Sequence, residues 1–276
     1  MKWGGAMNKS RRTAGKAHVL VCVAAFALLA VGMMAVLAPA ALAAQNSCPS
    51  GGTPPPGSSV NGGLEVDGTC IVNGVTVNGG ITVEATGHLQ LTSSIVNGGI
   101  VVLPCGEIDV NATTNGSGTP TGTFATINGG IVINAGTVCP VGNFSDADIR
   151  GALIDGGLSV TGAFPLALPF ICGNEIRGGV SLNNVSTPFG FFLGDPDAPV
   201  FGCPGNTIHG TVHVSNSTNL EVESNSVGGS VLLSGSILEL NGNTINGSLR
   251  CTDGTVILPG EPGDASGNTV HGANHC

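Results

Sequence analysis

The strongest constraint in this sequence is a seven-residue segment that recurs ten times with glycine at a fixed place. When the first aliphatic residue of each copy is numbered zero, glycine stands at position +2 in all ten copies. Position +4 is aliphatic in nine copies, and position +6 is aliphatic in eight and cysteine in the last two. The copies are 60–66, 77–83, 96–102, 127–133, 154–160, 176–182, 208–214, 227–233, 245–251 and 270–276. Self-similarity at so short a period is typical of a repeat architecture.

Alternation at positions 0, +2, +4 and +6 predicts a β-strand with one buried face. A glycine on that face leaves room for a neighbouring backbone to approach closely. Successive copies start 17, 19, 31, 27, 22, 32, 19, 18 and 25 residues apart. The short intervals fit one turn of a three-sided coil, and the long ones fit the same turn with an inserted loop. We therefore expect an all-β fold, a parallel β-solenoid of about ten turns of ~18–22 residues with loop insertions, and right-handed crossovers.

Asparagine stands at position −2 in the last five copies. In stacked turns these side chains would lie one above another at a corner, where an amide can both donate and accept hydrogen bonds. We expect them to bond to each other and to the backbone, as an asparagine ladder. The five residues are Asn174, Asn206, Asn225, Asn243 and Asn268.

The first 43 residues have the layout of a secretory signal peptide. A basic start is followed by an uncharged apolar run from Val19 to Ala38 and by the small-residue cleavage sequence Ala41-Leu42-Ala43. The alternative is an uncleaved membrane anchor, because the apolar run is close to the ~20 residues that span a bilayer. Residues 44–57 are expected to be a Pro/Gly-rich linker, and residues 58–276 the β-helix domain.

Removal of the signal leaves a strongly acidic, glycine-rich chain. Arg150, Arg177 and Arg250 are then the remaining strong cations, and all 17 acidic residues stay, so that the net charge is −14. Binding to nucleic acid or to anionic lipid needs clustered Lys or Arg. We therefore expect no nucleic-acid partner, and membrane contact only through the N-terminal segment if it is not cleaved.

Eight cysteines remain after the signal, and an even number in an exported chain favours disulfides over metal or thiol chemistry. The repeat register also predicts the pairs. Cys251 and Cys276 both stand at +6 of consecutive copies, about one strand spacing apart, which a disulfide can bridge. The expected pairs are Cys251–Cys276, Cys172–Cys203, Cys105–Cys139 and, by elimination, Cys48–Cys70.

With these motifs the chain resembles the right-handed parallel β-helix class over about residues 58–276. That class includes pectate-lyase-like enzymes, surface adhesins and the polymer-forming bactofilins, whose short three-sided turns are the most similar. The Asn-Thr-Ile/Val-x-Gly repeats and the C-terminal cysteine also resemble small exported proteins of actinobacteria to which no function is assigned. The resemblance implies a fold, and it leaves function to be argued from sites.

One candidate catalytic group follows from the register. Position +1 points outward, so Asp155, Arg177 and His209 should form an exposed column, with His213 nearby at +5. An acid, a cation and an imidazole in a row could serve a hydrolase or a lyase. The alternative is a surface ion pair beside an ordinary histidine.

Metal binding has two sets of candidates. His209 and His213, like His271 and His275, are four residues apart on an expected strand, about 13 Å, which is too far for one ion. Acid pairs could hold Ca²⁺, which prefers several oxygen ligands, and Asp195 with Asp197 in a loop is the best of them. The alternative, which we prefer because no calcium-roll motif accompanies the pair, is a solvated loop. The other pairs are Glu107/Asp109, Asp146/Asp148 and Glu221/Glu223. We expect no resident cofactor.

The eight phenylalanines after the signal lie in the insertions and are absent from the repeated segments. An exposed apolar patch often marks a partner surface, and the alternative is a satellite core under the loops. The candidates for docking are Phe164, Phe170, Phe189, Phe191, Phe192 and Phe201.

Two functional hypotheses follow. The first is a non-catalytic exported structural or surface-interaction protein, secreted or held at the cell surface, that self-associates or joins the cell envelope. The second is a carbohydrate-active enzyme, a polysaccharide lyase or hydrolase of the parallel β-helix class. Pectin-degrading members of that class use Arg/Lys pairs, aspartate clusters or a Gly-His-Gly motif, none of which we recognise in the sequence.

Overall fold

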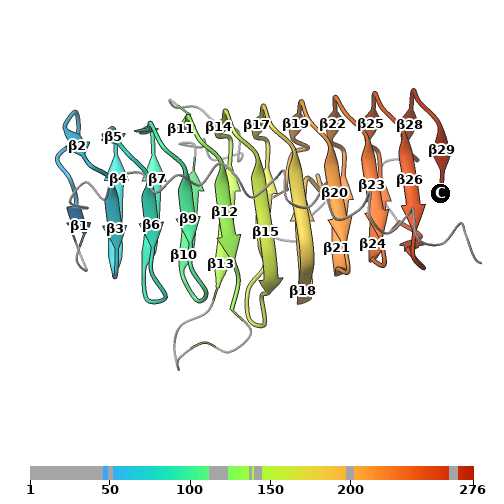
Figure 1. Ribbon diagram of the computed structural model, residues 1–276, viewed down its shortest axis with the longest axis horizontal. Coiled ribbons are helices and arrows are strands. Elements are labelled where there is room, and N and C mark those ends of the chain that lie inside the picture. Colours follow the sequence, from blue (N-terminus) through green and yellow to red (C-terminus); the bar gives the residue numbers. More distant parts are fainter. Residues whose placement is uncertain are drawn as a thin grey trace, which may run out of the picture. The chain divides into compact units, whose positions relative to one another are not determined.

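The computed structural model describes residues 46–48, 52–111, 124–136, 139, 145–196, 202–260 and 267–276. The expected signal peptide, residues 1–43, lies outside these described residues. Within them the regular elements are all β-strands, and the strands pair in parallel into one ten-stranded and one 19-stranded sheet. No helix in the described part of the chain is long and apolar enough to cross a bilayer. The expected all-β parallel solenoid is confirmed (Figure 1).

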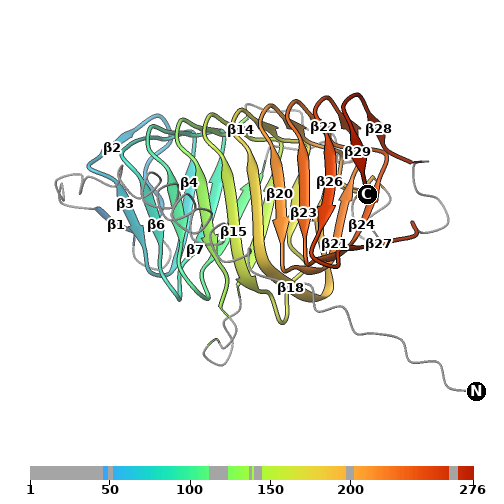
Figure 2. The same ribbon diagram turned by 45° about the vertical axis from the view of Figure 1, so that its right-hand side comes forward.

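The strands form three walls, and each turn of the chain passes through them in order (Figure 2). The first wall is the ten-stranded sheet: β2 (Ser59–Asn61), β5 (Thr76–Asn78), β8 (Ile95–Val96), β11 (Thr126–Ile127), β14 (Leu153–Ile154), β17 (Glu175–Ile176), β19 (Thr207–Ile208), β22 (Ser226–Val227), β25 (Thr244–Ile245) and β28 (Thr269–Val270).

The 19-stranded sheet supplies the other two walls, and β18 (Val180–Leu193) runs through both. The second wall also contains β1 (Asn46–Cys48), β3 (Leu64–Val66), β6 (Ile81–Val83), β9 (Ile100–Val102), β12 (Ile131–Asn134), β15 (Leu158–Ala163), β20 (Val212–Ser215), β23 (Val231–Ser234), β26 (Leu249–Thr252) and β29 (Asn274–His275). The third wall also contains β4 (Thr69–Asn73), β7 (His88–Thr92), β10 (Glu107–Asn111), β13 (Asp146–Arg150), β16 (Phe170–Cys172), β21 (Thr218–Glu223), β24 (Ile237–Asn241) and β27 (Val256–Leu258).

The repeated segment spans a corner between two walls. Position 0 lies in a first-wall strand, and positions +4 to +6 form a second-wall strand, as Val77 in β5 and Ile81–Val83 in β6 illustrate. The expectation of one continuous strand is therefore wrong. The pattern resembles that of a single strand because positions 0, +4 and +6 all face the same interior. Position 0 does so from the first wall, and positions +4 and +6 do so from the second.

Glycine at +2 is required because the corners stack with their backbones in contact. A Cβ on Gly156 would lie 2.5 Å from the amide nitrogen of Gly130 and 2.7 Å from the carbonyl carbon of Gly129. From Gly129 onward, the N–H of each corner glycine instead donates to the corner glycine of the preceding turn, for example Gly210 to Gly178 at 3.0 Å. This chain of bonds joins Gly98, Gly129, Gly156, Gly178, Gly210, Gly229, Gly247 and Gly272.

Aliphatic side chains from all three walls fill the interior. In one turn Ile127, Ile131 and Ile133 are each at most 1% exposed, and Ala147 and Ile149 of the third wall are fully buried. Burying an aliphatic side chain of this size contributes about 1.5–3 kcal/mol. A single turn has too few neighbours to bury its own face, so the stack as a whole is the stable unit.

The expected asparagine ladder is present and buried. The Nδ2 of Asn174 donates to Oδ1 of Asn206 at 2.9 Å, and Asn206 donates in the same way to Asn225 at 3.0 Å. Each buried amide also bonds to the backbone; Asn206 donates to the carbonyl of Ile171 at 2.7 Å. The ladder thus satisfies buried polar groups that would otherwise cost free energy at this corner.

Four disulfides join neighbouring turns, and they are the four pairs expected from the register. The Cα–Cα distances are 5.8 Å for Cys48–Cys70, 5.5 Å for Cys105–Cys139, 4.9 Å for Cys172–Cys203 and 5.0 Å for Cys251–Cys276. Cross-links between turns restrict the unfolded chain and hold the register of the stack.

The expected linker, residues 44–57, contributes to the fold. Asn46–Cys48 forms β1, which pairs with β3, and Gly52 bridges to Cys70. Cys48 is buried because its disulfide draws this segment onto the end of the stack. The β-helix therefore begins before residue 58.

A methyl group at the glycine corner should destabilise the protein. The Cβ of a Gly210→Ala variant would lie 2.6 Å from the nitrogen of Gly179, and overpacking of this kind costs about 1–3 kcal/mol. We expect the free energy of unfolding to fall by about 2 kcal/mol in guanidinium titrations of the oxidised protein. Thr207→Ala, an exposed change in the same turn, should stay within about 0.5 kcal/mol. Equal effects of the two variants would contradict the stacked corner.

The buried asparagine ladder should contribute more to the free energy of unfolding than similar asparagine bonds on the surface. Asn206→Ala removes the two bonds that its Oδ1 accepts from the backbone N–H and Nδ2 of Asn174, and the bond from its Nδ2 to the carbonyl of Ile171, all of them buried, a loss of about 2–4 kcal/mol. Asn97→Ala removes two side-chain bonds, to Asn78 and Asn128, that lie on the surface, and should cost under about 1 kcal/mol. Thermal or chemical unfolding of both variants measures the difference, and a larger loss for Asn97→Ala would be inconsistent with this assignment.

Candidate functional site

Carboxylates gather on the outer face of the third wall, where β7, β10 and β13 lie side by side. The inward residues Ile108, Val110 and Ile149 are buried, so the alternate positions project outward. Glu107 pairs in register with Asp146, and Asp109 with Asp148; on the other side, Glu107 pairs with His88. Two acid pairs named above as separate calcium candidates are therefore neighbours, about 4.8 Å apart along the stack.

An apolar loop stands beside these acids and forms a cleft with them. The cleft has a volume of about 390 Å³. Its lining residues are Asp109, Asp146, Asp148, Leu166, Ala167, Leu168, Phe170 and Phe189. The apolar lining residues come from the segment between β15 and β16, from the start of β16 and from β18. The inserted residues therefore form one side of the cleft.

Both ends of the loop are anchored. Phe164 is buried and contacts Phe191 with ring centroids 6.0 Å apart, and Phe170 stacks on Phe192 at 5.0 Å. Between these anchors the hydroxyl of Thr187 donates to the carbonyl of Ala167 at 3.3 Å. The loop that supplies the apolar lining of the cleft is thus held by packing and a hydrogen bond.

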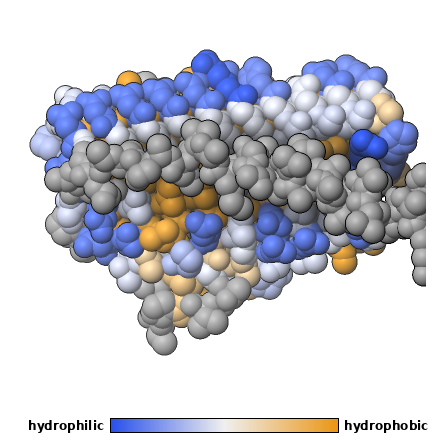
Figure 3. Space-filling model, in the orientation of Figure 1, coloured by the Kyte–Doolittle hydropathy of each residue, from blue (hydrophilic) through white to orange (hydrophobic). Residues whose placement is uncertain are grey.

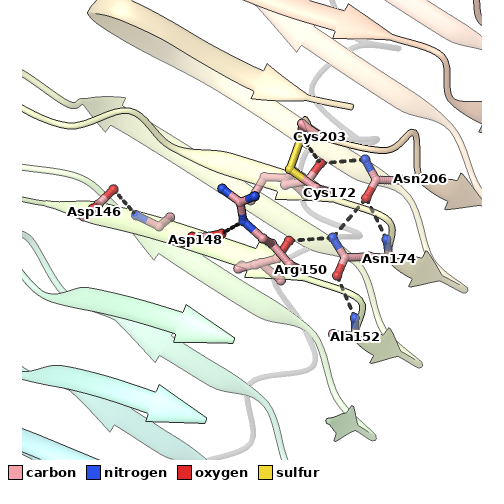
Figure 4. A network of polar contacts seen from close by, with 11 residues as sticks. Asp146, Asp148, Arg150, Ala152, Cys172, Asn174, Cys203 and Asn206 are labelled. Atoms are coloured by element: carbon pink, nitrogen blue, oxygen red, sulfur yellow. Dashed lines mark hydrogen bonds and ion pairs between the residues drawn. A yellow bond between two sulfur atoms is a disulfide. The ribbon is translucent and has the colours of Figure 1, made fainter. Parts of the chain in front are cut away.

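Two of the three acids that line the cleft pair with a basic side chain. Nε2 of His88 lies 2.7 Å from Oδ2 of Asp109, and Nε of Arg150 donates to Oδ1 of Asp148 at 2.5 Å. The Arg150 guanidinium also lies over the Phe170 ring, 4.6 Å from its centroid. Asp146 has no ion-pair partner in the described part of the chain, and its Oδ1 accepts the N–H of Ala147 at 2.8 Å (Figure 4).

The pKa values of Asp146, Asp148, Glu107 and His88 are all raised by their surroundings. Burial raises the pKa of Asp146 to about 6, and the charges of Asp109, Asp148 and Glu107 add to the rise. Burial also raises the pKa of Asp148, against the opposing bond from Arg150, and that of Glu107. The hydrogen bond with Asp109 is the main cause that raises the pKa of His88.

A second acid cluster lies further along the same wall. Burial raises the pKa of Glu221 to about 8, with further contributions from its hydrogen bond to Asp195 and from the charges of Asp195, Glu239 and Glu223. Asp195 is only 3% exposed. The structure therefore places Asp195, one of the two calcium candidates, beside Glu221; Asp197 lies outside the described residues.

The predicted column of Asp155, Arg177 and His209 exists as an exposed ion-pair network. Nη1 of Arg177 donates to Oδ1 of Asp155 at 2.7 Å. Glu175, which sequence analysis missed, bridges Arg177 at 3.5 Å and His209 at 3.4 Å. His213 projects from β20 on the second wall. Within the described chain this geometry fits a surface salt-bridge network, because Asp155 and Arg177 neutralise each other.

A groove of about 450 Å³ lies next to Glu175, and it is lined by Phe124, Thr126, Gly151, Ala152, Leu153, Gly173, Asn174, Glu175, Gly205 and Thr207. Asp155, Arg177 and His209 are not part of its lining. Its polar functional groups are hydroxyl, amide and a single carboxyl, which carry no acid–base pair.

Position +1, which holds Asp155, Arg177 and His209 in later turns, carries an exposed asparagine ladder in the first turns, in addition to the buried one. Asn78 donates to Asn61 at 2.9 Å, Asn97 to Asn78 at 2.7 Å and Asn128 to Asn97 at 2.7 Å. The signal was asparagine at position +1 in the first four copies. These bonds lock the outer edge of the N-terminal turns.

Most of the expected docking phenylalanines are buried. Phe164 and Phe191 belong to the main core, and Phe170 and Phe192 form a satellite cluster with the Cys172–Cys203 disulfide. Docking through these four is therefore wrong, because Phe191 and Phe192 pack inward from β18, and Phe164 and Phe170 pack against them. Phe189 is 57% exposed, and Phe201 lies outside the described residues.

Among the described residues, no group of three or more His, Cys, Asp or Glu side chains is arranged to hold a metal ion. His271 bonds to Asn246 at the exposed corner, with 3.0 Å between Nδ1 and Oδ1, and His275 lies in β29. Comparison with protein-family models, with curated proteins and with solved structures gave no match to this chain.

The five raised pKa values predict a protein that is more stable at mildly acidic pH. A carboxyl whose pKa is higher in the folded state stabilises fully below about pH 4, and this contribution is lost as the pH rises through about 6 for Asp146 and about 8 for Glu221. The contribution of His88 is likewise lost as the pH rises through its raised pKa.

We expect the free energy of unfolding to be at least about 2 kcal/mol higher at pH 5 than at pH 8. Guanidinium titrations of the oxidised protein at both pH values measure this. Glu221→Gln should reduce the difference, since it removes the largest shift. Greater stability at pH 8 would contradict the carboxyl environments described above.

Proposed function

We propose that this chain is an exported, non-catalytic structural or surface-interaction protein, a disulfide-stapled β-solenoid that works as a rigid scaffold. The observation that carries the proposal is the position of the four disulfides along the stack. Cys48–Cys70 and Cys251–Cys276 link the outermost turns at the two ends of the described fold. Cys105–Cys139 and Cys172–Cys203 span the two longest intervals between neighbouring repeat copies.

These are the places where a solenoid is weakest. Each turn contacts only its neighbours, so unfolding starts at a terminal or interrupted turn and spreads along the stack. A cross-link between adjacent turns at such a place opposes the first step. Disulfides of this kind persist in an oxidising compartment, which agrees with export through the N-terminal signal.

The surface supports a scaffold role as well. The exposed asparagine ladder and the salt-bridge network of Asp155, Arg177 and His209 satisfy the polar groups of the outer corner with one another. The resemblance to bactofilin-like short turns and to exported actinobacterial repeat proteins points the same way.

A carbohydrate-active enzyme is the second candidate, and its place shifts from the Asp155 column to the cleft on the third wall. There Asp146, with its pKa raised to about 6, lies near acids with cationic partners. Unequal carboxyl environments of this kind suit acid–base work. A glycan panel with a reducing-end assay discriminates the two functions; activity that is lost in Asp148→Asn would replace the scaffold proposal.

Analysis of the protein from its own cells tests the scaffold proposal. We expect a mature N-terminus at Ala44, presence in the medium or at the cell surface, and four intact disulfides by non-reducing peptide mapping. Reduction should make the folded protein susceptible to protease, with the first cuts near 105–139, 172–203 and the end turns. A cytosolic protein with free thiols and an intact Met1 would refute it.

A further inference from the structure

We propose that the cleft on the third wall is a binding site for a small organic cation that carries an apolar group. The ammonium would lie against Asp146, and the hydrocarbon part against Leu168, Phe189 and the exposed end of the loop at Leu166. This ligand site goes beyond the scaffold role and does not depend on it.

The charge of the cleft selects a cation. Asp109 and Asp148 bond to His88 and Arg150, whereas Asp146 has no cationic partner in the described residues and faces the charges of its neighbours. One positive group beside Asp146 would offset that repulsion, and a partly buried carboxylate forms strong charge-assisted hydrogen bonds to ammonium. An anion would meet only carboxylates on this side.

The apolar residues that line the cleft favour a ligand with an apolar group. Leu166 and Phe189 are 68% and 57% exposed and line the same cleft. Figure 3 shows hydrophobic side chains near the middle of the face that Figure 1 presents, with hydrophilic ones beside them; the lining of the cleft itself is the set of residues named above. A ligand that covered Leu166 and Phe189 would remove apolar surface from water, which a metal ion or a simple amine cannot do.

Packing and hydrogen bonds hold the apolar lining of the cleft in place. Phe164 and Phe170 anchor the two ends of the loop, Phe192 donates its N–H to the carbonyl of Pro169 at 3.0 Å, and the Cys172–Cys203 disulfide holds the turn behind it. A volume of about 390 Å³ is in the range of small-molecule pockets, and preformed walls reduce the entropy lost on binding.

An NMR titration of the oxidised protein at pH 7.5 tests the proposal with three probes. Phenethylammonium carries both the charge and the apolar group, 2-phenylethanol lacks the charge, and methylammonium lacks the apolar group. We expect phenethylammonium to bind at least about tenfold more tightly than either of the others, because each lacks one of the two contacts.

Matched variants locate the site. Asp146→Asn should weaken phenethylammonium binding about tenfold, and Phe189→Ala should weaken it severalfold. Glu65→Gln, an acid on the second wall, and Phe124→Ala, a phenylalanine of similar exposure in the other groove, should leave it unchanged. Phe189 is exposed, so its variant stays interpretable if Asp146→Asn were to alter the fold.

Three results would overturn the proposal: equal affinity for phenethylammonium and 2-phenylethanol, unchanged affinity in both Asp146→Asn and Phe189→Ala, or tighter binding of a neutral oligosaccharide at the same residues. The last result would favour the carbohydrate-active candidate, and it would leave the scaffold test by peptide mapping and localisation unaffected.

Discussion

Backbone contact at one corner is the constraint on which the rest of this structure depends. A Cβ on the corner glycines would lie within 2.5–2.7 Å of the backbone of the adjacent turn, and the glycine N–H groups donate from turn to turn. That contact fixes how far each turn can shift against the next. Once the shift is fixed, Asn206 lies on Asn225 and Cys251 opposite Cys276, and the aliphatic positions form one continuous core.

The outer face of the third wall carries carboxyl groups in environments that oppose their ionisation. Partly buried carboxyls such as Asp146 and Glu221 hold their protons more tightly when folded, which means that their ionised forms destabilise the fold. Asp146 lies beside the loop that makes the cleft. The repeated segments thus form the stacked core, and the inserted segment between β15 and β16 forms part of the cleft.

Much of the fold could be predicted because the repeat fixes it locally. The disulfide pairs and the buried asparagine ladder follow from position in the copy alone, and the structure contains both. The corner was mistaken for a strand because both bury positions 0, +4 and +6. The exposed ladder at Asn97 also had a signal, asparagine at position +1 of the first four copies, whereas the bridge through Glu175 needed the turn-to-turn register of three dimensions.

The cleft could not have been predicted from the sequence. Glu107/Asp109 and Asp146/Asp148 are separated by an insertion, and only the pairing of β10 with β13 makes them neighbours. The phenylalanines misled in the same way, because β18 turns Phe191 inward while Phe189 stays exposed. Inserted segments carry no repeat pattern, so their side chains can be placed only once the chain is folded.

Hydrogen exchange at the corner glycines tests the central claim most directly. An amide in an ordinary exposed turn exchanges quickly, whereas these amides donate to the preceding turn, as Gly156 does to Gly129 at 3.1 Å and Gly247 to Gly229 at 2.9 Å. The stacked corner predicts protection of the glycine amides from Gly129 to Gly247 comparable to that of the adjoining strand residues. Rapid exchange at these glycines, with protection confined to the strands, would contradict it.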